Sequence, residues 1–446
     1  MALRPSSADD PRLLQAMTAS VAAHGYRQTT VANVIALAGV GRNSFYARYP
    51  NKEQCFLAAY ERILASAVRE ATTAAAPDAT SPAERVAPAM TALFALVAAE
   101  PASARAALLE SAAAGEAAFR FRTQATEALA AELARSLDAD AERDAPADRV
   151  LFGICGGVES FLCTRVREGR ERELIGTAPA VAAWAASYTA CVQTGAPTLD
   201  VPSPIPPRAP ASSPTPAAPG HLAPTGPSGR RGLPPGPKRE PRDFIAHNVR
   251  DRLLDAVATV AARDGYTALS VAEIVAEAQT SRRSFYEHFT TVEEAFCAAL
   301  MLGAEGAMAA TLVVYATRAD WRDAIIAGVG SFCSFMAAEP AFARVGIIEA
   351  LTGGVAVLEV RDQAQAAFAA LLADAYRRGD GDQPEDPVLT AELVAGAILA
   401  LCADTIRREG PSTLTALAPD AAVLALVPAI GAAAATDAVA AFYVQA

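Results

Sequence analysis

An internal duplication constrains the fold of this chain more than any other feature. The segment from Asp10 to Phe56 aligns without a gap to the segment from Arg250 to Phe296, and 17 of the 47 aligned positions are identical. Unrelated segments of this length share only a few residues. The chain therefore contains two copies of one structural unit, and each copy is expected to fold in the same way.

The composition predicts a helical protein with more than one domain. At 446 residues the chain exceeds the usual size of a single domain. Alanine, which favours helices, supplies much of the hydrophobic fraction of 52%. Every run of 18 mostly apolar residues contains a charged residue or a proline, so we expect no transmembrane helix. We also find no apolar stretch typical of a secretion signal. We therefore expect a soluble, cytoplasmic protein that does not enter a membrane.

Three short helices are predicted in each copy of the duplicated segment. In the first copy, apolar residues recur at three- and four-residue intervals from a start near Asp10 to Gly25, which ends the first helix because glycine accepts a left-handed conformation. Gly39-Val40 forms the turn between the second and third helices, and the third helix runs from Arg42 to Tyr46. This arrangement is typical of a helix-turn-helix unit that reads DNA.

Short polar side chains mark the starts of the later helices. Thr30 suits the N-cap of the second helix, and in the second copy Ser270 is expected to complete a capping box with Glu273. Asn51 and Thr291 are expected to cap a fourth helix in the two copies. The same helix boundaries are therefore predicted twice.

The remainder of each copy alternates helical patterns with short breaks. One break, Glu100-Pro101, recurs as Glu339-Pro340. Between Gly195 and Pro241 lie 15 of the chain's 30 prolines, and such a stretch is expected to form an extended tether rather than a packed domain. The predicted domains are head 1 (residues 1–56), body 1 (57–195), a linker (196–241), head 2 (242–296) and body 2 (297–446).

Both heads resemble the N-terminal domain of the tetracycline-repressor (TetR-type) family of bacterial transcriptional regulators. In head 1 the matching residues are Thr30-Val31, Ala36-Leu37-Ala38-Gly39-Val40, Ser44-Phe45-Tyr46 and Tyr49-Pro50-Asn51-Lys52-Glu53. In head 2 they are Ser270-Val271-Ala272-Glu273-Ile274, Ser281-Arg282, Ser284-Phe285-Tyr286-Glu287-His288-Phe289 and Glu293. The resemblance covers about 50 residues in each half of the chain.

The resemblance implies an all-α protein made of two tandem TetR-like units. In this family the first three helices bind a double-stranded DNA operator, and the body holds a small-molecule effector and pairs through its last two long helices. Ordinary members form homodimers, whereas here two protomers are already joined. The resemblance therefore implies a repressor, released by its effector, that self-associates as an intramolecular pseudo-dimer. Its four-helix bundle would consist of Val150–Glu168, Pro179–Val192, Ala391–Glu409 and Pro419–Ile430. Dimers of two such chains remain an alternative.

Side chains that suit DNA contacts gather at the third helix of each head. A reading helix needs groups that reach base edges and donors that bind phosphates. In head 1 the expected base contacts are Arg42, Asn43 and Ser44, and the expected phosphate contacts are Thr29, Thr30, Tyr46 and Lys52. In head 2 the matching base contacts are Ser281, Arg282 and Arg283, and the matching phosphate contacts are Ser270, Tyr286 and His288. Phe45 and Phe285 are instead expected to pack in the cores of the heads.

The two heads are expected to differ as DNA readers. The chain has a net charge of −11, but residues 1–60 carry six basic and three acidic side chains, whereas residues 230–300 carry ten of each. Val292 stands where head 1 has Lys52, and the third helices differ in sequence. If both heads bind, they should prefer different half-sites in an asymmetric operator. Basic residues before head 2 could grip DNA or form a solvated linker end: Arg230, Arg231, Lys238, Arg239 and Arg242.

Candidates for the effector pocket are aromatic and polar residues of the bodies. In body 1 they are Phe94, Phe119, Phe121, Phe152, Glu159 and Phe161, and in body 2 they are Phe332, Phe335 and Met336. Each also fits the packed core that any helical bundle needs. The run Gly153-Ile154-Cys155-Gly156-Gly157 would allow close approach of helices at the dimer interface, or a loosened helix beside a pocket.

Other classes of function find little support in the residues. The seven cysteines form no CxxC pair and the four histidines no HxxxH spacing, so we expect buried, reduced thiols and no metal site. No GxSxG, P-loop, dinucleotide or HExxH motif predicts an enzyme or a cofactor. A helical scaffold or small-molecule-binding protein in which one or both heads no longer bind DNA is the second hypothesis.

Overall fold

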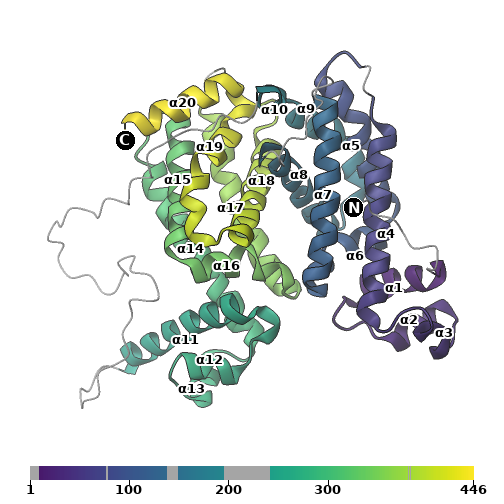
Figure 1. Ribbon diagram of the computed structural model, residues 1–446. Helices are drawn as coiled ribbons and strands as arrows, with labels where there is room; N and C mark the ends of the chain where they lie inside the picture. The colour runs from purple at the N-terminus through teal and green to yellow at the C-terminus, as the bar shows by residue number, and fades with distance from the viewer. Residues whose placement is uncertain are drawn as a thin grey trace. The chain divides into compact units, whose positions relative to one another are not determined.

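The computed structural model describes residues 10–76, 79–137, 149–194, 242–379, 381 and 383–445 (Figure 1). Every secondary-structure element in these residues is a helix, which confirms the all-α prediction. The linker and its basic residues Arg230, Arg231, Lys238 and Arg239 lie outside the described residues, and so does the side chain of Arg242. The predictions about them stay predictions.

Head 1 contains three helices and the start of a fourth. They are α1 (Pro11–His24), α2 (Val31–Ala38), α3 (Arg42–Tyr46) and α4 (Lys52–Ala74). Asp10 caps α1 by accepting a hydrogen bond from the Arg12 amide at 3.0 Å, and Gly25 ends it with a φ of 79°. Because α4 continues into body 1 without a break, the orientation of head 1 is tied to that helix.

Head 2 repeats this arrangement. Its elements are α11 (Arg242–Asp264), the short helix η4 (Tyr266–Ala268), α12 (Val271–Glu277) and α13 (Arg282–His288), followed by α14 (Val292–Tyr315). The core of head 1 includes Leu13, Val34, Phe45 and Phe56. The core of head 2 contains the residues 240 positions later, Leu253, Ile274, Phe285 and Phe296. The duplicated segments therefore bury the same positions, and the prediction that Phe45 and Phe285 are core residues is confirmed.

The predicted N-caps are present, with one correction. Asn51 accepts a hydrogen bond from the Gln54 amide at 2.8 Å, and Thr291 accepts one from the Glu294 amide at 3.0 Å. The reciprocal capping box, however, forms at Thr30, where the Asn33 side chain accepts from the Thr30 amide. At Ser270 the Glu273 carboxylate instead accepts from the serine hydroxyl at 2.9 Å. The Asn33 side chain thus accepts from the backbone N–H of its N-cap residue, Thr30. The Glu273 carboxylate was expected to accept from the Ser270 backbone N–H in the same way, but it binds the hydroxyl.

Body 1 is a bundle of helices that continues from α4. It contains α5 (Pro82–Ala99), α6 (Pro101–Leu108), η1 (Ser111–Ala114), α7 (Glu116–Leu137), α8 (Arg149–Arg167), η2 (Glu171–Glu173), α9 (Leu174–Ala186) and α10 (Thr189–Thr194). The last two correct the prediction of one helix over Pro179–Val192. The helix begins five residues earlier, so that Pro179 lies inside it, and it is interrupted at Ser187 and Tyr188. The Tyr188 hydroxyl donates to the Leu424 carbonyl at 2.8 Å.

Body 2 follows the same order. It contains α15 (Trp321–Ala338), α16 (Pro340–Ile347), η5 (Glu349–Thr352), α17 (Val355–Arg377), α18 (Pro387–Arg408), η6 (Pro411–Thr413), α19 (Leu414–Ile430) and α20 (Ala432–Gln445). The repeated Glu-Pro break has the same conformation in both bodies. Glu100 has φ −121° and ψ 63°, Glu339 has φ −119° and ψ 65°, and the flanking helices bend by 103° and 110°. Proline fixes φ and lacks an N–H, so it starts a new helix at each corner.

Contacts between residues divide the chain into two compact units. Unit 1 comprises Met1–Thr198, Ala369–Leu401 and Val423–Thr436, and unit 2 comprises Leu199–Phe368, Cys402–Ala422 and Asp437–Ala446. Unit 1 thus joins the first repeat to residues of α17, α18, α19 and the start of α20 from the second repeat. The units are described separately here.

Within unit 1, α8 lies very close to the first part of α18. A Cβ at Gly157 would lie 2.6 Å from the Leu393 carbonyl oxygen, and a Cβ at Gly156 would overlap the methyl group of Ala400. Glycine is required at both positions because the neighbouring helix occupies the space of a side chain. Of the two interpretations of the glycine run, close helix approach is the one that these contacts support.

Several helices of this alanine-rich chain are strongly apolar. By length and composition alone, α14, α18 and the stretch Pro411–Ile430 could cross a membrane. The apolar windows of α18 and Pro411–Ile430 are 67% and 61% buried inside the protein, and that of α14 is 28% buried. Packing within the protein therefore accounts for most of the apolar surface of the first two.

The seven cysteines are free thiols. Cys55, Cys191, Cys333 and Cys402 are buried, and the other three are partly buried. The prediction of reduced cysteines packed as small apolar residues is confirmed for the first four.

Candidate nucleic-acid interface

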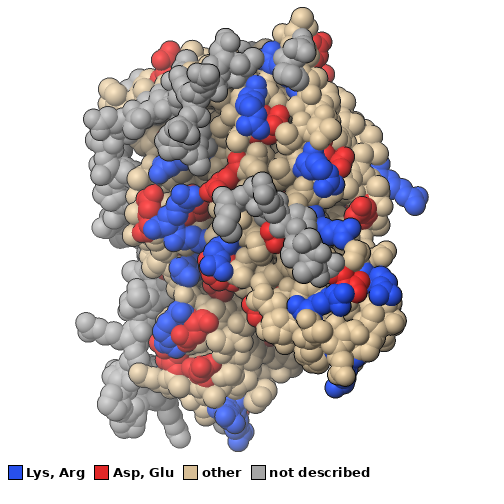
Figure 2. Space-filling model, turned by 45° about the vertical axis from the view of Figure 1, so that its right-hand side comes forward, with Lys and Arg blue, Asp and Glu red and all other residues tan. Residues whose placement is uncertain are grey.

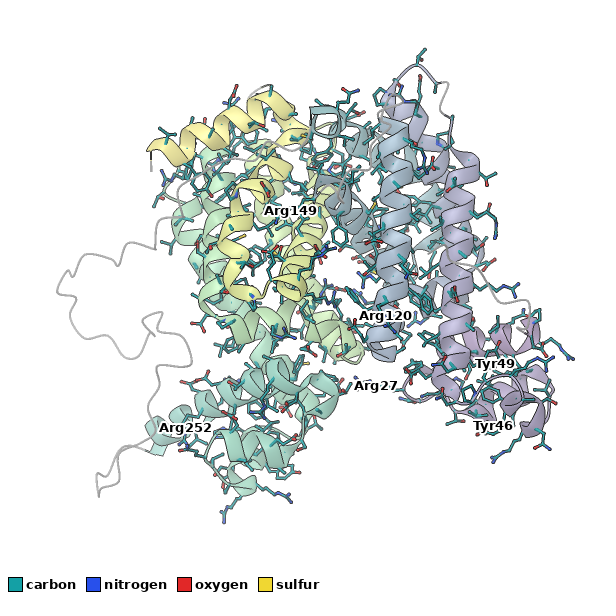
Figure 3. All side chains as sticks on the ribbon, viewed as in Figure 1. Arg27, Tyr46, Tyr49, Arg120, Arg149 and Arg252 are labelled. Atoms are coloured by element: carbon teal, nitrogen blue, oxygen red, sulfur yellow. The ribbon has the colours of Figure 1, made fainter. Side chains whose placement is uncertain are left out.

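The outward face of α3 carries four of the predicted DNA contacts. Arg42, Asn43, Ser44 and Tyr46 are all exposed, whereas Phe45 between them is fully buried. Tyr46 keeps 53% of its surface accessible, which is unusual for a large aromatic residue (Figure 3). Because Phe45 anchors the helix to the core, its neighbours are held on the solvent side, where a DNA groove could reach them.

The outward face of α13 repeats this pattern in head 2. Arg282 and Arg283 are exposed, Phe285 is fully buried, and Tyr286 is 59% exposed. Arg283 donates to the Glu287 carboxylate at 3.0 Å, with side-chain exposures of 88% and 56%. Such an exposed ion pair contributes little energy, so it would not hold Arg283 away from DNA.

The hydroxyl groups predicted to contact DNA serve the protein itself. Thr29 is 1% exposed, and its hydroxyl donates to the Gly25 carbonyl at 2.9 Å, so it cannot reach a phosphate. Thr30, Ser270 and Ser281 are N-caps of α2, α12 and α13, and their oxygens accept from backbone amides of those helices. The prediction for Thr29 is wrong. The other three side chains are at the surface with their hydroxyls already engaged.

Two further predicted phosphate contacts are only partly accessible. The Lys52 ammonium donates to the Tyr26 carbonyl at 2.9 Å and lies 4.5 Å from the centre of the Tyr26 ring. Burial lowers the pKa of Lys52. His288, near the end of α13, is also partly buried. The Lys52 ammonium thus holds the loop between α1 and α2 by donating to the Tyr26 and Arg27 carbonyls, which leaves one N–H for a phosphate.

Sequence reasoning did not select two exposed arginines of head 1. Arg48 follows α3 directly, and Arg27 lies in the loop between α1 and α2 (Figure 3). Both were counted in the positive charge of residues 1–60, which was the available signal. The face of the protein in Figure 2 carries basic and acidic residues close together rather than one continuous basic area. The exposed arginines of head 1 are therefore the feature that suits DNA, although the chain as a whole has a net charge of −11.

A carboxylate joins each head to its own body. In unit 1 the Glu110 carboxylate accepts a hydrogen bond from the Tyr26 amide at 2.9 Å. In unit 2 the Glu349 carboxylate accepts one from the Tyr266 amide at 3.0 Å. The two glutamates stand 239 residues apart, the same offset as the repeated Glu-Pro corners, so this latch could have been found by extending the alignment into the bodies.

Body 1 contains a partly open apolar cavity of about 180 Å³ among helices α4 to α8. Its lining includes Leu64 and Ala67 from α4, Met90 from α5, Ala104 and Leu108 from α6, Leu129 from α7, and Ile154 and Cys155 from α8. Lining residues of α7 recur at three- and four-residue intervals from Arg122 to Ser136, so the cavity follows that helix for about 20 Å at 1.5 Å per residue. Such a space suits an elongated apolar molecule.

Of the candidate ligand residues in body 1, only Glu159 lines this cavity. Phe94 is fully buried and stacks on Phe161 at 6.1 Å, and Phe119 and Phe152 are partly buried elsewhere. In body 2, Phe332 packs edge-on against Phe368 at 5.0 Å, Met336 is 6% exposed, and Phe335 fills the space above Gly306. Aromatic residues are selected by any helical core, so residue type alone did not identify the lining.

An ion pair stands in the wall of the cavity. The Arg122 guanidinium lies 2.8 Å from the Glu159 carboxylate, and 32% and 23% of their side-chain surfaces are accessible. Burial disfavours the charged guanidinium, but the Glu159 carboxylate together with Tyr60 and Cys163 outweighs this effect and raises the pKa of Arg122. Burial, aided by the charge of Glu159, raises the pKa of the Cys155 thiol to about 12. The cavity thus presents an ion pair and a protonated thiol among mostly apolar side chains, and its lining also includes the acidic residues Glu100 and Glu132.

Comparison with known proteins agrees with the helix-turn-helix geometry. The family model for bacterial regulatory proteins of the tetR family matches twice, at residues 13–59 and 253–296. A search of curated proteins returned no match.

Several solved structures are similar to part of the chain. The fatty acid degradation regulator FadR from Bacillus halodurans is 18% identical, covers 40% of this chain and 95% of its own, and gives a TM-score of 0.36. FadR from Bacillus subtilis in complex with stearoyl-CoA is 15% identical over 39% and 96%, with a TM-score of 0.36. A tetR-family regulatory protein from Rhodococcus RHA1 is 22% identical over 41% and 97%, with a TM-score of 0.37.

The two family matches coincide with the two heads, in which α3 and α13 expose arginine and tyrosine beside a buried phenylalanine. Regulators of this family bind DNA operators and are generally not enzymes. The chain is therefore a DNA-binding transcriptional regulator with two TetR-like units in tandem, each of which begins with a head that matches the tetR-family model.

Proposed function

We propose that the chain is an effector-released repressor whose two repeats form an intramolecular pseudo-dimer and read two different half-sites. The observation that carries the proposal is the matched exposure of α3 and α13. Each helix turns one phenylalanine inward and presents arginine and tyrosine outward. Two such helices in one chain replace the two subunits of an ordinary dimeric repressor.

The half-sites are proposed to differ because the outward residues differ. Head 1 presents Arg42 and Asn43, and head 2 presents Arg282 and Arg283. Asparagine suits adenine, whereas arginine suits guanine, and one good bidentate contact is worth about 1–3 kcal/mol of discrimination. The preferred operator would then be asymmetric, with one half-site richer in guanine.

The pairing of repeats is supported by contacts in unit 1. α8 and α18 lie in close contact through glycine, and Arg165 forms an ion pair with Glu392 at 2.9 Å. Tyr188, beside α10, donates to the Leu424 carbonyl of α19. These are the terminal helices through which each body would pair in the proposed pseudo-dimer.

The effector is proposed to occupy the cavity of body 1. α6 supplies part of its wall, and Glu110, just after α6, holds the Tyr26 amide of head 1. A molecule that displaces α6 would therefore move the attachment point of the head. The protein is released from DNA if the effector binds more tightly to the state with displaced heads. The coupling free energy between effector binding and operator binding then sets the loss of operator affinity. The proposed place of action is the nucleoid in the cytoplasm.

The test is selection of bound sequences from random duplex DNA with the full-length protein, Arg42→Ala and Arg282→Ala. The proposal expects one asymmetric site, and each variant should relax selection on one side only. A palindrome that depends on Arg42 alone would contradict it. In that case head 1 alone would read DNA, and separate chains would have to dimerise.

A second candidate function follows from the departures of head 2. Val292 stands at the position of Lys52, and residues 230–300 carry ten acidic side chains against ten basic ones. Head 2 could then serve as a scaffold without DNA binding. Binding to the selected duplex at increasing salt separates the two functions, because a head that grips phosphates loses affinity as salt rises. If Arg282→Ala leaves both the affinity and the salt slope unchanged, the scaffold function holds for head 2.

A further inference from the structure

We propose that the α8–α18 interface admits only unlike repeats, so that α8 pairs with the α18 of a second repeat and not with another α8. The inference rests on the proposed pseudo-dimer and adds which surfaces can form it. It concerns residues of unit 1 alone.

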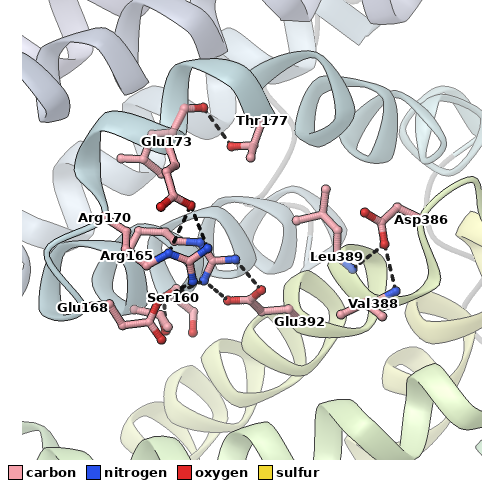
Figure 4. Close-up of polar contacts among 12 residues, drawn as sticks. Ser160, Arg165, Glu168, Arg170, Glu173, Thr177, Asp386, Val388, Leu389 and Glu392 are labelled. Carbon is pink, nitrogen blue, oxygen red and sulfur yellow. Dashed lines mark hydrogen bonds and ion pairs between the residues drawn. The ribbon is translucent and has the colours of Figure 1, made fainter.

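An almost buried ion pair joins the two helices. The two Nη atoms of Arg165 each donate to one carboxylate oxygen of Glu392 at 2.9 Å (Figure 4). Only 14% and 22% of the two side-chain surfaces are accessible, and the guanidinium also lies 4.3 Å from the centre of the Phe161 ring. A bidentate pair with so little solvent around it fixes the orientation of its partner.

The two members of this pair have no equivalents in the opposite repeat. The shared sequence Arg-Glu-Gly at residues 167–169 and 408–410 aligns α8 with α18. By this alignment Arg165 corresponds to Ile406, and Glu392 corresponds to Leu151. Two α8 helices paired in the same way would place Arg165 against a leucine. Two α18 helices would place Glu392 against an isoleucine. Two α18 helices would leave the mostly buried Glu392 carboxylate without this partner, and two α8 helices would leave Arg165 only Glu168 of its own helix, at 3.8 Å, in place of the bidentate contact. Both losses are unfavourable.

The sizes of the side chains also favour the pairing of α8 with α18 over the pairing of two like helices. α8 provides Gly153, Gly156 and Gly157, and a Cβ at Gly153 would lie 2.8 Å from the Leu424 side chain and 3.5 Å from that of Leu401. The aligned positions of α18 are Val394, Ala397 and Ile398. Two α18 helices at this distance would overlap, because Ala397 and Ile398 stand where α8 has Gly156 and Gly157. Two α8 helices would lose the Ala397 methyl group that lies beside Gly157, because Gly156 stands at the aligned position. α18 also contributes one glycine, Gly396, where a Cβ would lie 2.6 Å from the Ser160 side chain, so the two helices fit together through different residues.

The experiment cuts the chain after folding. A protease site replaces part of the linker (residues 196–241) in the full-length protein, and the folded protein is cleaved to give an N-terminal and a C-terminal fragment. The cleaved protein is mixed with a cleaved isotope-labelled copy, and native mass spectrometry follows which fragments associate. Unlike pairs exchange labels but never become like pairs if the inference is correct.

Charge reversal tests the ion pair within this assay. Arg165→Glu and Glu392→Arg should each speed fragment exchange by about tenfold or more, because each places like charges together. The double variant should restore slow exchange. Arg170→Glu is the matched control, because Arg170 pairs with Glu173 at 2.7 Å within the first repeat, and these side chains are 47% and 56% exposed.

Three results would overturn the inference. Pairs of two N-terminal or two C-terminal fragments from wild-type protein would show that the interface does not discriminate, although the pseudo-dimer itself would stand. A double variant as weak as the single variants would show that Arg165 and Glu392 do not specify the pairing. Immediate separation into single fragments would remove the pseudo-dimer and this inference together.

Discussion

Gln279 bears a backbone cost that its counterpart in head 1 avoids. It is the one non-glycine residue with a positive φ in the described part of the chain, at 49°, and it stands where head 1 has Gly39 with a φ of 64°. Arg252 donates to the Gln279 carbonyl at 2.9 Å and helps to hold this turn (Figure 3). The left-handed conformation costs a residue with a Cβ about 1–2 kcal/mol.

Replacing Gln279 with glycine should therefore stabilise head 2 by about 0.5–1 kcal/mol, because relief of strain exceeds the extra entropy of unfolded glycine. Gly39→Ala should destabilise head 1 by about 1 kcal/mol. Hydrogen exchange of amides in α12 and α13, and in α2 and α3 for the second variant, measures each head separately. Faster exchange in Gln279→Gly would show that the side chain makes a compensating contact.

Glu159 shows how one residue can serve both stability and the cavity. Glu159→Ala should destabilise the protein by about 1–3 kcal/mol, because Arg122 would keep its charge in the cavity wall without a partner. The lower end of this range reflects the accessible part of the pair. Replacing both residues with leucine should recover most of the loss, and thermal unfolding measures all three.

An exposed pair provides the comparison for Glu159. Arg69→Ala breaks the contact of Arg69 with Glu70 at 3.3 Å, where both side chains are exposed, and should change stability by less than about 0.5 kcal/mol. Equal effects of Arg69→Ala and Glu159→Ala would contradict the role given to the cavity pair.

At the scale of elements, glycine decides how closely α8 can pack. A Cβ at Gly157 would meet a backbone oxygen, which cannot move without moving its helix, whereas a Cβ at Gly176 in α9 would meet nothing within 4 Å. Gly157→Ala should lower stability by about 1–3 kcal/mol through forced separation of the helices. Gly176→Ala should raise it by up to about 1 kcal/mol through helix propensity. Urea unfolding of the two variants tests the contrast, and a neutral Gly157→Ala would show that the helices are further apart.

The scale of the whole molecule concerns how many chains act on one operator. An ordinary dimeric regulator needs two chains, whereas the proposed pseudo-dimer places both reading helices in one chain of 46.0 kDa. Analytical ultracentrifugation with a labelled duplex of the selected site should therefore find one chain per duplex at concentrations near the dissociation constant. Two chains on each duplex would mean that the heads work between chains.

The sequence by itself determined the heads. Their helix boundaries, N-caps, buried phenylalanines and outward arginines follow from patterns that span fewer than 50 residues, and the duplication displayed each pattern twice. Local signals of this kind survive because capping and the alternation of buried and exposed positions act between residues close in the chain. The burial of Thr29 was not predicted, because a hydroxyl that is hydrogen-bonded to the backbone can be buried as readily as an apolar group.

Only the tertiary structure decided what the bodies do. In alanine-rich helices almost every face is apolar enough to be buried, so periodicity could not say which face lines a cavity and which meets another helix. Arg122 and Glu159 come from different helices, and Arg165 and Glu392 are 227 residues apart in the chain. Such pairs depend on the rotation and the distance of packed helices, which are set by side-chain fit across the whole body rather than by any local pattern.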